Sequence, residues 1–321
     1  MIGLRRFWAW PSELHRAGVL GMNARNCAYV LPANPRCHYP RVDNKLLTKK
    51  ICEGRGIPVP ETYAVIRRHG DIRRFPELLG DRRQFVIKPC SGSEGRGITV
   101  VAGRDGEACI TPSGIRIPYA DVRYHLSTML SGLYSLGGQP DQAIIEQRII
   151  KHPVFERVAV DGTPDVRIIL YRCVPVMAMV RLPTRLSRGR ANLHQGAVAA
   201  GIDLARGCTF GGVCQNRAIA AHPDTGVPIA GIDVPCWDRL LDASMKLADA
   251  LELAYLGVDF VLDVDHGPVV LEANARPGLA IQIANRCGLG PRLEWIDRQP
   301  RDCLTGDRRE LLSRLRAGAF A

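Results

Sequence analysis

The stretch Phe85–Val101 reads FVIKPCSGSEGRGITVV and is the most informative segment of the sequence. An apolar run ends at Lys88, and a loop containing Gly92, Gly95 and Gly97 then leads into a second apolar, β-branched run. Glycines let backbone N–H groups approach an anion closely, so this loop is typical of a phosphate-binding site.

The order of residues in the loop excludes the two most familiar nucleotide-binding loops. A P-loop places its lysine after the glycines at the start of a helix, whereas Lys88 precedes them. A dinucleotide-binding loop reads G-x-G-x-x-G and opens into a helix, whereas this loop reads G-x-x-G-x-G and runs into ITVV. We expect strands over 85–88 and 98–101, with the loop between them.

The composition indicates a well-cored globular protein that favours anionic partners. Of its 321 residues, 46% are hydrophobic and 23% are charged, and the formal net charge is +11. Nucleotides, acidic peptides, nucleic acid or a membrane surface would suit that charge. The eleven cysteines include no C-x-x-C pair and the eight histidines show no metal-type spacing. We therefore expect free thiols rather than disulfides or a zinc site.

Hydrophobic periodicity predicts an α+β fold. We expect helices over 43–56, 119–134, 237–256 and 308–320, the last packing Leu311, Leu312 and Leu315 against the protein. We expect strands after IPVPET and over 142–150, 165–173 and 174–182. Asp43 is the expected N-cap of the first of these helices. Helices mixed with antiparallel hairpins indicate the α+β class.

The run GVDFVLDVDHGPVVLEANARPGL, residues 257–279, predicts a hairpin that carries oxygen ligands on one face. Glu272 and Asn274 are two residues apart on a strand, so their side chains point to the same face. Asp259 lies on the partner strand, within reach of that face. Two carboxylates and an amide oxygen are ligands that suit Mg²⁺. The alternative is a solvent-facing edge.

Arginine placement gives a third signal. Arg167 and Arg181 each interrupt an apolar strand run, and a buried guanidinium requires an anionic partner. Arg185, Arg188 and Arg190 follow just before NLHQGA. Arginine holds phosphate or carboxylate in a bidentate manner, although a solvated surface charge is the alternative for each loop arginine.

The first residues, MIGLRRFWAWPSEL, raise the question of targeting. Polar residues follow the two arginines too closely for a twin-arginine signal, and no run is long enough to span a membrane. One interpretation is a basic, aromatic anchor lying on a membrane. The interpretation we favour is a first helix that packs Phe7, Trp8 and Trp10 onto the core, without membrane contact.

The ordered set of motifs resembles the ATP-grasp superfamily, most closely its alpha-L-glutamate-ligase-like, RimK-related branch. The resemblance extends from Asp43 to Leu289 and includes the glycine loop, EQRI, PDVRI, NLHQGA and LEANARPG. It implies two α+β subdomains that grip ATP, with the glycine loop closing over the phosphates. The implied parts are an N-terminal segment (1–42), a lid subdomain (43–140), a C-terminal subdomain (141–290) and a helical tail (291–321). Residues 1–42 are too few for the family's N-terminal α/β domain, so a truncated segment wrapping the core is implied.

The resemblance also implies roles for individual residues. ATP is expected to bind Lys45, Lys88, Gly92, Ser93, Gly95, Gly97, Glu146, Gln147, Arg148 and Ile149. Phosphate and substrate are expected to contact the catalytic residues Arg167, Arg181, Arg190 and Asn192. The Mg²⁺ ligands, for two ions with Mn²⁺ as an alternative, are Asp259, Glu272 and Asn274. NLHQGA lacks the arginine and second glycine of the family's N-L-H-R-G-G loop, which leaves the substrates open.

The activity that this resemblance implies is that of an ADP-forming carboxylate–amine ligase. A substrate carboxylate attacks the γ-phosphate of ATP to give an acyl phosphate, and an amine then displaces phosphate. The product is an amide or peptide bond, for example glutamate or another amino acid joined to a small molecule, peptide or protein. Catalysis consists of positioning and charge neutralisation, so Cys90 is expected to be incidental. The requirement for ATP predicts a cytoplasmic protein.

Other functions remain open from the sequence. A basic chain could bind nucleic acid, but we expect no such partner because no binding motif is present and aromatic residues make up only 6%. An ATP-binding scaffold without ligase activity is a second alternative. A kinase that stops at phosphoryl transfer is a third. A homo-oligomer is also possible.

Overall fold

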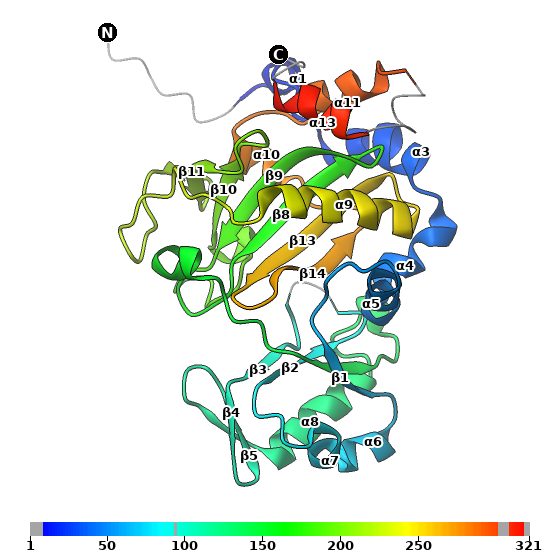
Figure 1. Ribbon diagram of the computed structural model, residues 1–321, viewed down its shortest axis with the longest axis vertical. Helices are drawn as coiled ribbons and strands as arrows, with labels where there is room; N and C mark the ends of the chain where they lie inside the picture. The colour runs from blue at the N-terminus through cyan, green and yellow to red at the C-terminus, as the bar shows by residue number, and fades with distance from the viewer. Residues whose placement is uncertain (1–8, 93–94, 301–307, 318–321) are drawn as a thin grey trace.

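The structure is a computed structural model that describes residues 9–92, 95–300 and 308–317. Ser93 lies outside the described residues, as do Phe7 and Trp8. Two antiparallel sheets dominate the fold, one of seven strands and one of four, and helices pack on both (Figure 1). The mixed α+β class predicted from periodicity is therefore confirmed.

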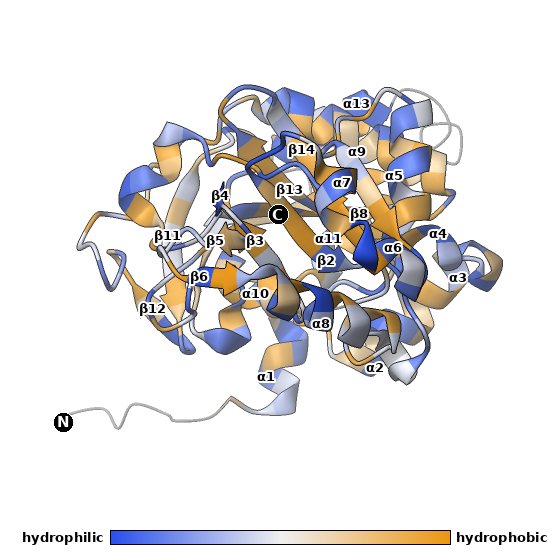
Figure 2. Ribbon diagram, turned by 90° about the horizontal axis from the view of Figure 1, so that it is seen from below, coloured by the Kyte–Doolittle hydropathy of each residue, from blue (hydrophilic) through white to orange (hydrophobic). Residues whose placement is uncertain are grey.

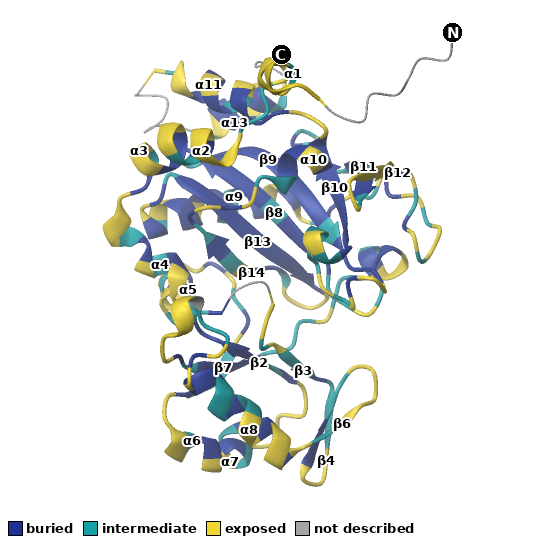
Figure 3. Ribbon diagram, turned by 180° about the vertical axis from the view of Figure 1, so that it is seen from behind, coloured by how far each residue is buried: buried dark blue, intermediate teal, exposed yellow. Residues whose placement is uncertain are grey.

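The seven-stranded sheet forms the larger part of the molecule. Its strand order is β12-β11-β10-β9-β8-β13-β14. The strands are β8 (Asp165–Tyr171), β9 (Val174–Leu182), β10 (Val198–Ile202), β11 (Thr209–Cys214), β12 (Arg217–Ile219), β13 (Tyr255–Asp263) and β14 (Gly267–Asn274). Helix α9 (Trp237–Leu251) lies across one face of the sheet (Figure 1). The central strands are buried along nearly their whole length (Figure 3), which explains why their sequences are continuously apolar rather than alternating.

The four-stranded sheet forms the smaller part. Its order is β1-β7-β2-β3, with β1 (Thr62–Ile66), β7 (Ala143–Glu146), β2 (Phe85–Pro89) and β3 (Thr99–Val101). It is accompanied by helices α6 (His69–Arg73), α7 (Phe75–Leu79) and α8 (Tyr119–Leu130) and by a meander of β4 (Gly103–Asp105), β5 (Ala108–Ile110) and β6 (Arg116–Pro118). Its core is separate from that of the larger sheet and contains Phe75, Phe85 and Leu126.

The division of the chain into subdomains remains a proposal. The predicted boundary between 140 and 141 would separate β7 from the sheet in which it is a central strand. A boundary after Glu146 keeps both sheets whole. The hydrophobic core of the larger sheet also includes Cys52 and Ile57, which precede β1 in the sequence.

The N-terminal segment packs onto the larger core. Its helices are α1 (Pro11–Arg16), α2 (Met22–Ala24), a π-helix (Arg25–Val30), α3 (Leu31–Ala33), a 3₁₀ turn (Arg36–His38), α4 (Pro40–Asp43) and α5 (Lys45–Gly54). The Asn34 side chain donates to the carbonyl of Tyr255 at 2.7 Å and accepts from its N–H at 2.9 Å. The Leu20 N–H donates to the side-chain oxygen of Gln282 at 2.9 Å. These bonds join the segment to elements more than two hundred residues later in the chain.

In the described part of the chain, α10 (Ala280–Asn285), α11 (Gly290–Asp297) and α13 (Arg308–Arg316) follow the last strand. Leu311, Leu312 and Leu315 of α13 are buried, so their predicted packing is confirmed. Arginines on α13 also form ion pairs with aspartates on α9: Arg308–Asp249, Arg309–Asp242 and Arg316–Asp238. The hydropathy colouring shows apolar strands such as β8 and β13 enclosed by helices with mixed surfaces (Figure 2).

Several predicted element ends differ from the structure. The N-cap of α5 is Asn44, whose side-chain oxygen accepts from the N–H groups of Leu46 and Leu47, whereas Asp43 closes α4. Helix α8 ends at Leu130, because Gly132 takes a φ of +86° that no helix continues. The predicted helix 237–256 ends at Leu251, and the predicted strand 142–150 is reduced to β7.

The predicted packing of the first aromatic residues onto the core is wrong for Trp10, the one of the three that lies within the described residues. Trp10 is the residue before α1, and it is 56% exposed. Among the described residues, no helix is both long enough and apolar enough to cross a membrane. All the described cysteines are free thiols, which confirms the prediction against disulfides.

Candidate functional site

Two lysines share one buried carboxylate where the small sheet meets α5. Glu146 lies at the end of β7 and is 2% exposed. Its two oxygens lie 2.5 Å from Nζ of Lys88, on β2, and 2.7 Å from Nζ of Lys49, on α5. Register explains the first contact, because Lys88 is directly opposite Ile144 on β7, two residues before Glu146, which makes Lys88 and Glu146 diagonal neighbours on one face of the sheet. Helical spacing explains the second, since Lys49 lies one turn after Lys45 on α5.

The cluster carries one more positive than negative charge. Burial alone would raise the pKa of Glu146, but the charges of Lys88 and Lys49 outweigh it and hold that pKa below its usual value. Burial lowers the pKa of Lys49, an effect that Glu146 opposes and Lys88 reinforces. A surplus positive charge in a buried site is costly unless an anion binds next to it. The cluster is therefore suited to an anionic ligand such as a phosphate group.

Lys45 joins the glycine loop to the hairpin of the large sheet. Its Nζ donates to the carbonyl of Gly92 at 2.6 Å and lies 3.4 Å from a carboxylate oxygen of Glu272. Gly92, which is predicted to bind ATP, and Glu272, which is predicted to bind metal, thus both contact the ammonium group of Lys45. Cys90, at the start of the loop, donates its thiol hydrogen to the side-chain oxygen of Asn44, and burial raises its pKa. A structural contact of this kind fits the predicted incidental role.

The far end of the glycine loop is supported by the region around the end of α8. The carbonyl of Gly97 lies 3.0 Å from Nε2 of His125, and the ring of Tyr134 lies directly under Gly97. A Cβ atom added to Gly97 would lie 2.7 Å from Cγ of Tyr134, whereas one added to Gly95 would meet nothing within 4 Å. Both glycines have positive φ, +75° and +70° respectively. Positive φ therefore favours glycine at both positions. At Gly97 the ring of Tyr134 also leaves no room for a side chain.

The segment 147–149, which is predicted to bind ATP, continues from β7. The Gln147 N–H donates to the carbonyl of Glu61 at 2.8 Å. Arg148 donates to the side-chain oxygen of Gln84 at 3.1 Å, and burial lowers its pKa. Ile149 is half-buried. The segment therefore follows the lysine–glutamate cluster directly, and the next residue, Ile150, donates its N–H to the side chain of Asp263 on β13 of the large sheet at 2.9 Å.

Four charged side chains form a network on one face of the large sheet. Arg167 and Asp259 are directly opposite on β8 and β13, and Nε and Nη2 of Arg167 each lie 2.6 Å from an oxygen of Asp259. Arg181, on β9, forms a bidentate pair with Asp165 and also donates to Asp259 at 3.0 Å. The network is electrically neutral. Both predicted strand arginines therefore have the anionic partners that their burial requires.

Burial and the arginines act in opposite directions on the two aspartates. Burial would raise the pKa of Asp259, but Arg167 and then Arg181 outweigh it and hold the pKa below its usual value. At Asp165 burial dominates and raises the pKa to about 6, with Arg181 opposing it and the negative charge of Asp259 adding to it. Asp259 is therefore ionised at neutral pH, and its oxygens can act as ligands for a cation.

The predicted metal ligands share a face of the sheet. Asp259 is directly opposite Glu272, and Asn274 follows two residues later on β14. The amide of Asn274 is buried, and its nitrogen has no hydrogen-bond partner within the described chain. An unpaired buried N–H donor costs about 1–3 kcal/mol, so this nitrogen is placed for an acceptor that the described residues do not supply, whereas a metal ion would bind the amide oxygen.

The donor set of two carboxylates and one amide fits Mg²⁺. Across residues 9–92, 95–300 and 308–317, no three His, Cys, Asp or Glu side chains meet in a way that could hold a metal. That result does not bear on Asp259, Glu272 and Asn274, because one of these three donors is an amide. Their assignment to Mg²⁺ remains a proposal.

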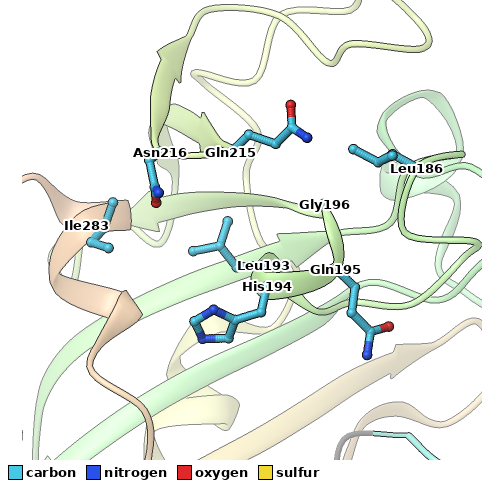
Figure 4. A pocket seen from close by; sticks show the side chains of 8 residues that line it. All are labelled: Leu186, Leu193, His194, Gln195, Gly196, Gln215, Asn216 and Ile283. Atoms are coloured by element: carbon cyan, nitrogen blue, oxygen red, sulfur yellow. The ribbon is translucent and has the colours of Figure 1, made fainter.

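Arg190 and Asn192 belong to a turn before β10. The side-chain oxygen of Asn192 accepts from the N–H of His194 and caps a 3₁₀ turn over Leu193–Gln195. Arg190 donates to the side-chain oxygen of Gln195 at 3.2 Å. This turn forms one wall of a pocket with a volume of about 410 Å³, which the β11–β12 turn and α10 complete (Figure 4).

With this geometry established, the chain can be compared with known families. The sequence model of a family described as sugar-transfer associated ATP-grasp matches residues 24–298. The chain belongs to this family. The predicted ATP-grasp fold is therefore confirmed, and the resemblance to the ATP-grasp superfamily is confirmed with it. No curated protein matches the chain.

Several solved structures are similar to this ATP-grasp protein. The ATP-grasp ligase PsnB complexed with a minimal precursor is 14% identical with a TM-score of 0.46, covering 85% of this chain and 63% of PsnB. D-alanine–D-alanine ligase from Bacillus anthracis is 17% identical with a TM-score of 0.45, covering 89% and 72%. D-cycloserine synthetase DcsG is 15% identical with a TM-score of 0.45, covering 88% and 73%. Similarities at this level do not identify an activity.

Two site residues of this ATP-grasp chain escape the motif-based prediction. Lys49 forms half of the lysine pair on Glu146, and the spacing of Lys45 and Lys49 along one helix face was a signal that could have revealed it. Asp165 holds Arg181, and its place two residues before Arg167 in PDVRI was the corresponding signal. Among the described residues, Arg190 and Asn192 form hydrogen bonds within their own turn, with Gln195 and His194, and not with the charged network.

Proposed function

We propose that the protein is an ATP-dependent carboxylate–amine ligase that forms ADP. The observation that carries the proposal is the position of Lys45, which contacts the glycine-loop carbonyl of Gly92 and the proposed metal ligand Glu272. A nucleotide bound between the sheets would present its phosphates to this lysine, to Lys88 and to Lys49. Positioning and charge neutralisation at this point are what phosphoryl transfer requires.

The residues present would hold the groups that this chemistry needs. Asp259, Glu272 and Asn274 would ligate Mg²⁺, which neutralises the negative charge that develops on the phosphates. The glycine loop would cover the phosphates, and residues 147–149 would contact the adenine. Arg167 and Arg181 would hold the acyl phosphate, with Asp165 fixing the orientation of Arg181. An amine acceptor would then attack the acyl carbon and expel phosphate.

The proposed substrates rest on the family resemblance and on the charge of the protein. A relation to the RimK-like glutamate ligases would make an amino acid the amine or acid component, and an acidic peptide a suitable acceptor for a basic protein. The family description, sugar-transfer associated, directs attention to acceptors that contain a sugar. We propose a cytoplasmic location because the reaction consumes ATP.

The test is nucleotide turnover by the purified chain with Mg-ATP and a pool of amino acids, acidic peptides and amino sugars. We expect ADP and phosphate, together with a product heavier by one condensation. Glu272→Gln should lower turnover at least about a hundredfold while the far-ultraviolet circular dichroism stays unchanged, because a carboxylate ligand is lost without a change of shape. AMP and pyrophosphate would contradict the acyl-phosphate route. ADP formation without any condensed product would indicate a kinase, and full activity of Glu272→Gln would contradict the metal assignment.

A further inference from the structure

The pocket beside the 193–195 turn has a lining that differs from the rest of this basic protein. Carboxamide side chains come from three positions, Gln195, Gln215 and Asn216. Aliphatic side chains come from Leu186, Leu193 and Ile283, and Figure 4 shows them around the same space. His194 and Gly196 complete the lining, which contains no lysine, arginine, aspartate or glutamate, although the chain has a net charge of +11. A ligand suited to this pocket is therefore neutral.

The carboxamides are suited to hydroxyl groups. A carboxamide offers both a donor and an acceptor, as does each hydroxyl group of a sugar. The side chains of Gln215 and Asn216 make no hydrogen bond to other described residues and are exposed at the pocket. The aliphatic side chains provide the apolar surface against which the C–H faces of a sugar ring can pack. The volume, about 410 Å³, lies within the usual range for small-molecule sites.

The backbone at this pocket supports a role for Gln215. Gln215 and Asn216 form the two-residue turn between β11 and β12, with φ values of +47° and +61°. Such turns favour glycine, asparagine or aspartate, because other side chains are strained at positive φ. Asn216 suits its position, and Gln215 is strained there, as Arg172 is in the equivalent two-residue turn between β8 and β9. Strain at Gln215 therefore supports a binding role only together with its place in the pocket lining.

The turn that lines the pocket lies one strand away from the charged network. Gln195 lines the pocket and accepts a hydrogen bond from Arg190, and Asn192 caps the same turn. The chain then enters β10, whose Ala199 is directly opposite Arg181 on β9. A ligand in the pocket would therefore lie beside the start of β10, the strand next to the one that carries Arg181.

We propose that this pocket binds a neutral saccharide portion of the substrate. The inference rests on the proposed ligase function for its place in the reaction, because the saccharide would anchor the molecule whose carboxylate or amine reacts. Its recognition chemistry rests on the lining alone.

The test is binding of methyl glycosides of glucose, galactose, mannose and N-acetylglucosamine to the full chain, measured by saturation-transfer NMR and titration. The informative variant is Gln215→Gly combined with Asn216→Gly, since glycine is favoured at both turn positions and the fold should survive. The matched control is Gln139→Ala, which removes an exposed carboxamide from the smaller part of the molecule. ATP affinity is measured in parallel on all three proteins.

We expect at least one glycoside to bind the unmodified chain and the Gln139 variant equally, and about tenfold or more weakly to the double variant. ATP affinity should be the same in all three. The proposal is overturned if no glycoside binds, if the double variant binds as well as the unmodified chain, or if methyl glucuronide, which carries a carboxylate, binds more tightly than every neutral glycoside. Glycoside binding without ATP turnover would contradict the ligase function alone, and ATP turnover without glycoside binding would contradict the pocket alone.

Discussion

At the scale of single residues, the site depends on how buried charges are shared. Glu146 accepts from two lysines rather than one, which leaves a net positive charge beside the glycine loop. A one-to-one pair would be neutral and would have no electrostatic preference for a phosphate. We therefore expect the second lysine, Lys49, to give the cluster an affinity for an anion.

Lys49→Met should weaken ATP binding about tenfold or more, because the cluster loses its surplus charge and one charged donor. Lys50→Met is the matched control: Lys50 is the next residue on the same helix and is exposed. Equilibrium binding of ATP to both variants, with thermal unfolding to verify the fold, makes the measurement. Equal affinities for the two variants would show that Lys49 has only a structural role.

Residue-scale reasoning from sequence reaches some of these contacts and misses others. Arg167 and Arg181 could be expected to have anionic partners, since each interrupts an apolar strand. Their partner Asp259 could not be predicted, because Arg167 and Asp259 are 92 residues apart and only the register of β8 against β13 brings them together. The N-cap of α5 was misplaced by one residue because Asp and Asn cap equally well.

At the scale of elements, strands and hairpins were predicted more accurately than helix ends. The strands β8, β9, β13 and β14 follow the predicted runs closely, because burial on the large sheet requires continuous apolar sequence. The predicted helices extend too far because periodic apolar residues continue past the turn that ends each helix. In α8 that turn is at Gly132, where an added Cβ atom would collide with the backbone of Gln139.

Gly97→Ala should lower ATP turnover about tenfold more than Gly95→Ala. Both substitutions place alanine at positive φ, but only the first forces a methyl group into the ring of Tyr134, and such overpacking typically costs about 1–3 kcal/mol. Steady-state kinetics with varied ATP concentration measures the difference. If both variants lose the same activity, backbone strain alone would account for the effect and the Tyr134 contact would be unimportant.

At the scale of the whole molecule, two separate hydrophobic cores support the two sheets. Cys52 belongs to the core of the larger sheet and Cys109 to that of the smaller one. Burial raises the pKa of Cys52 to about 12 and that of Cys109 to about 11. These two thiols therefore report on the two cores independently.

A thiol-reactive reagent at mildly alkaline pH should leave Cys52 and Cys109 unmodified in the native protein. The thiolate is the reactive form, and both its fraction and its accessibility are very small for these residues. Mass spectrometry of digested protein should instead find label at the exposed thiols, Cys27, Cys37, Cys236 and Cys287. Labelling after denaturation is the control. Native labelling of Cys109 alone would show that the smaller core opens independently of the larger one.

The long-range attachment of the N-terminal segment bears on how the chain folds during its synthesis. The strands of the smaller sheet all lie between residues 62 and 146, so that sheet can close soon after Glu146 leaves the ribosome. Asn34 and Leu20 bind residues 255 and 282, which are translated much later. Asn34 and Leu20 therefore cannot make these contacts until residues 255 and 282 have been synthesised. We expect this segment to be the part of the nascent protein that most needs a chaperone's protection from proteases.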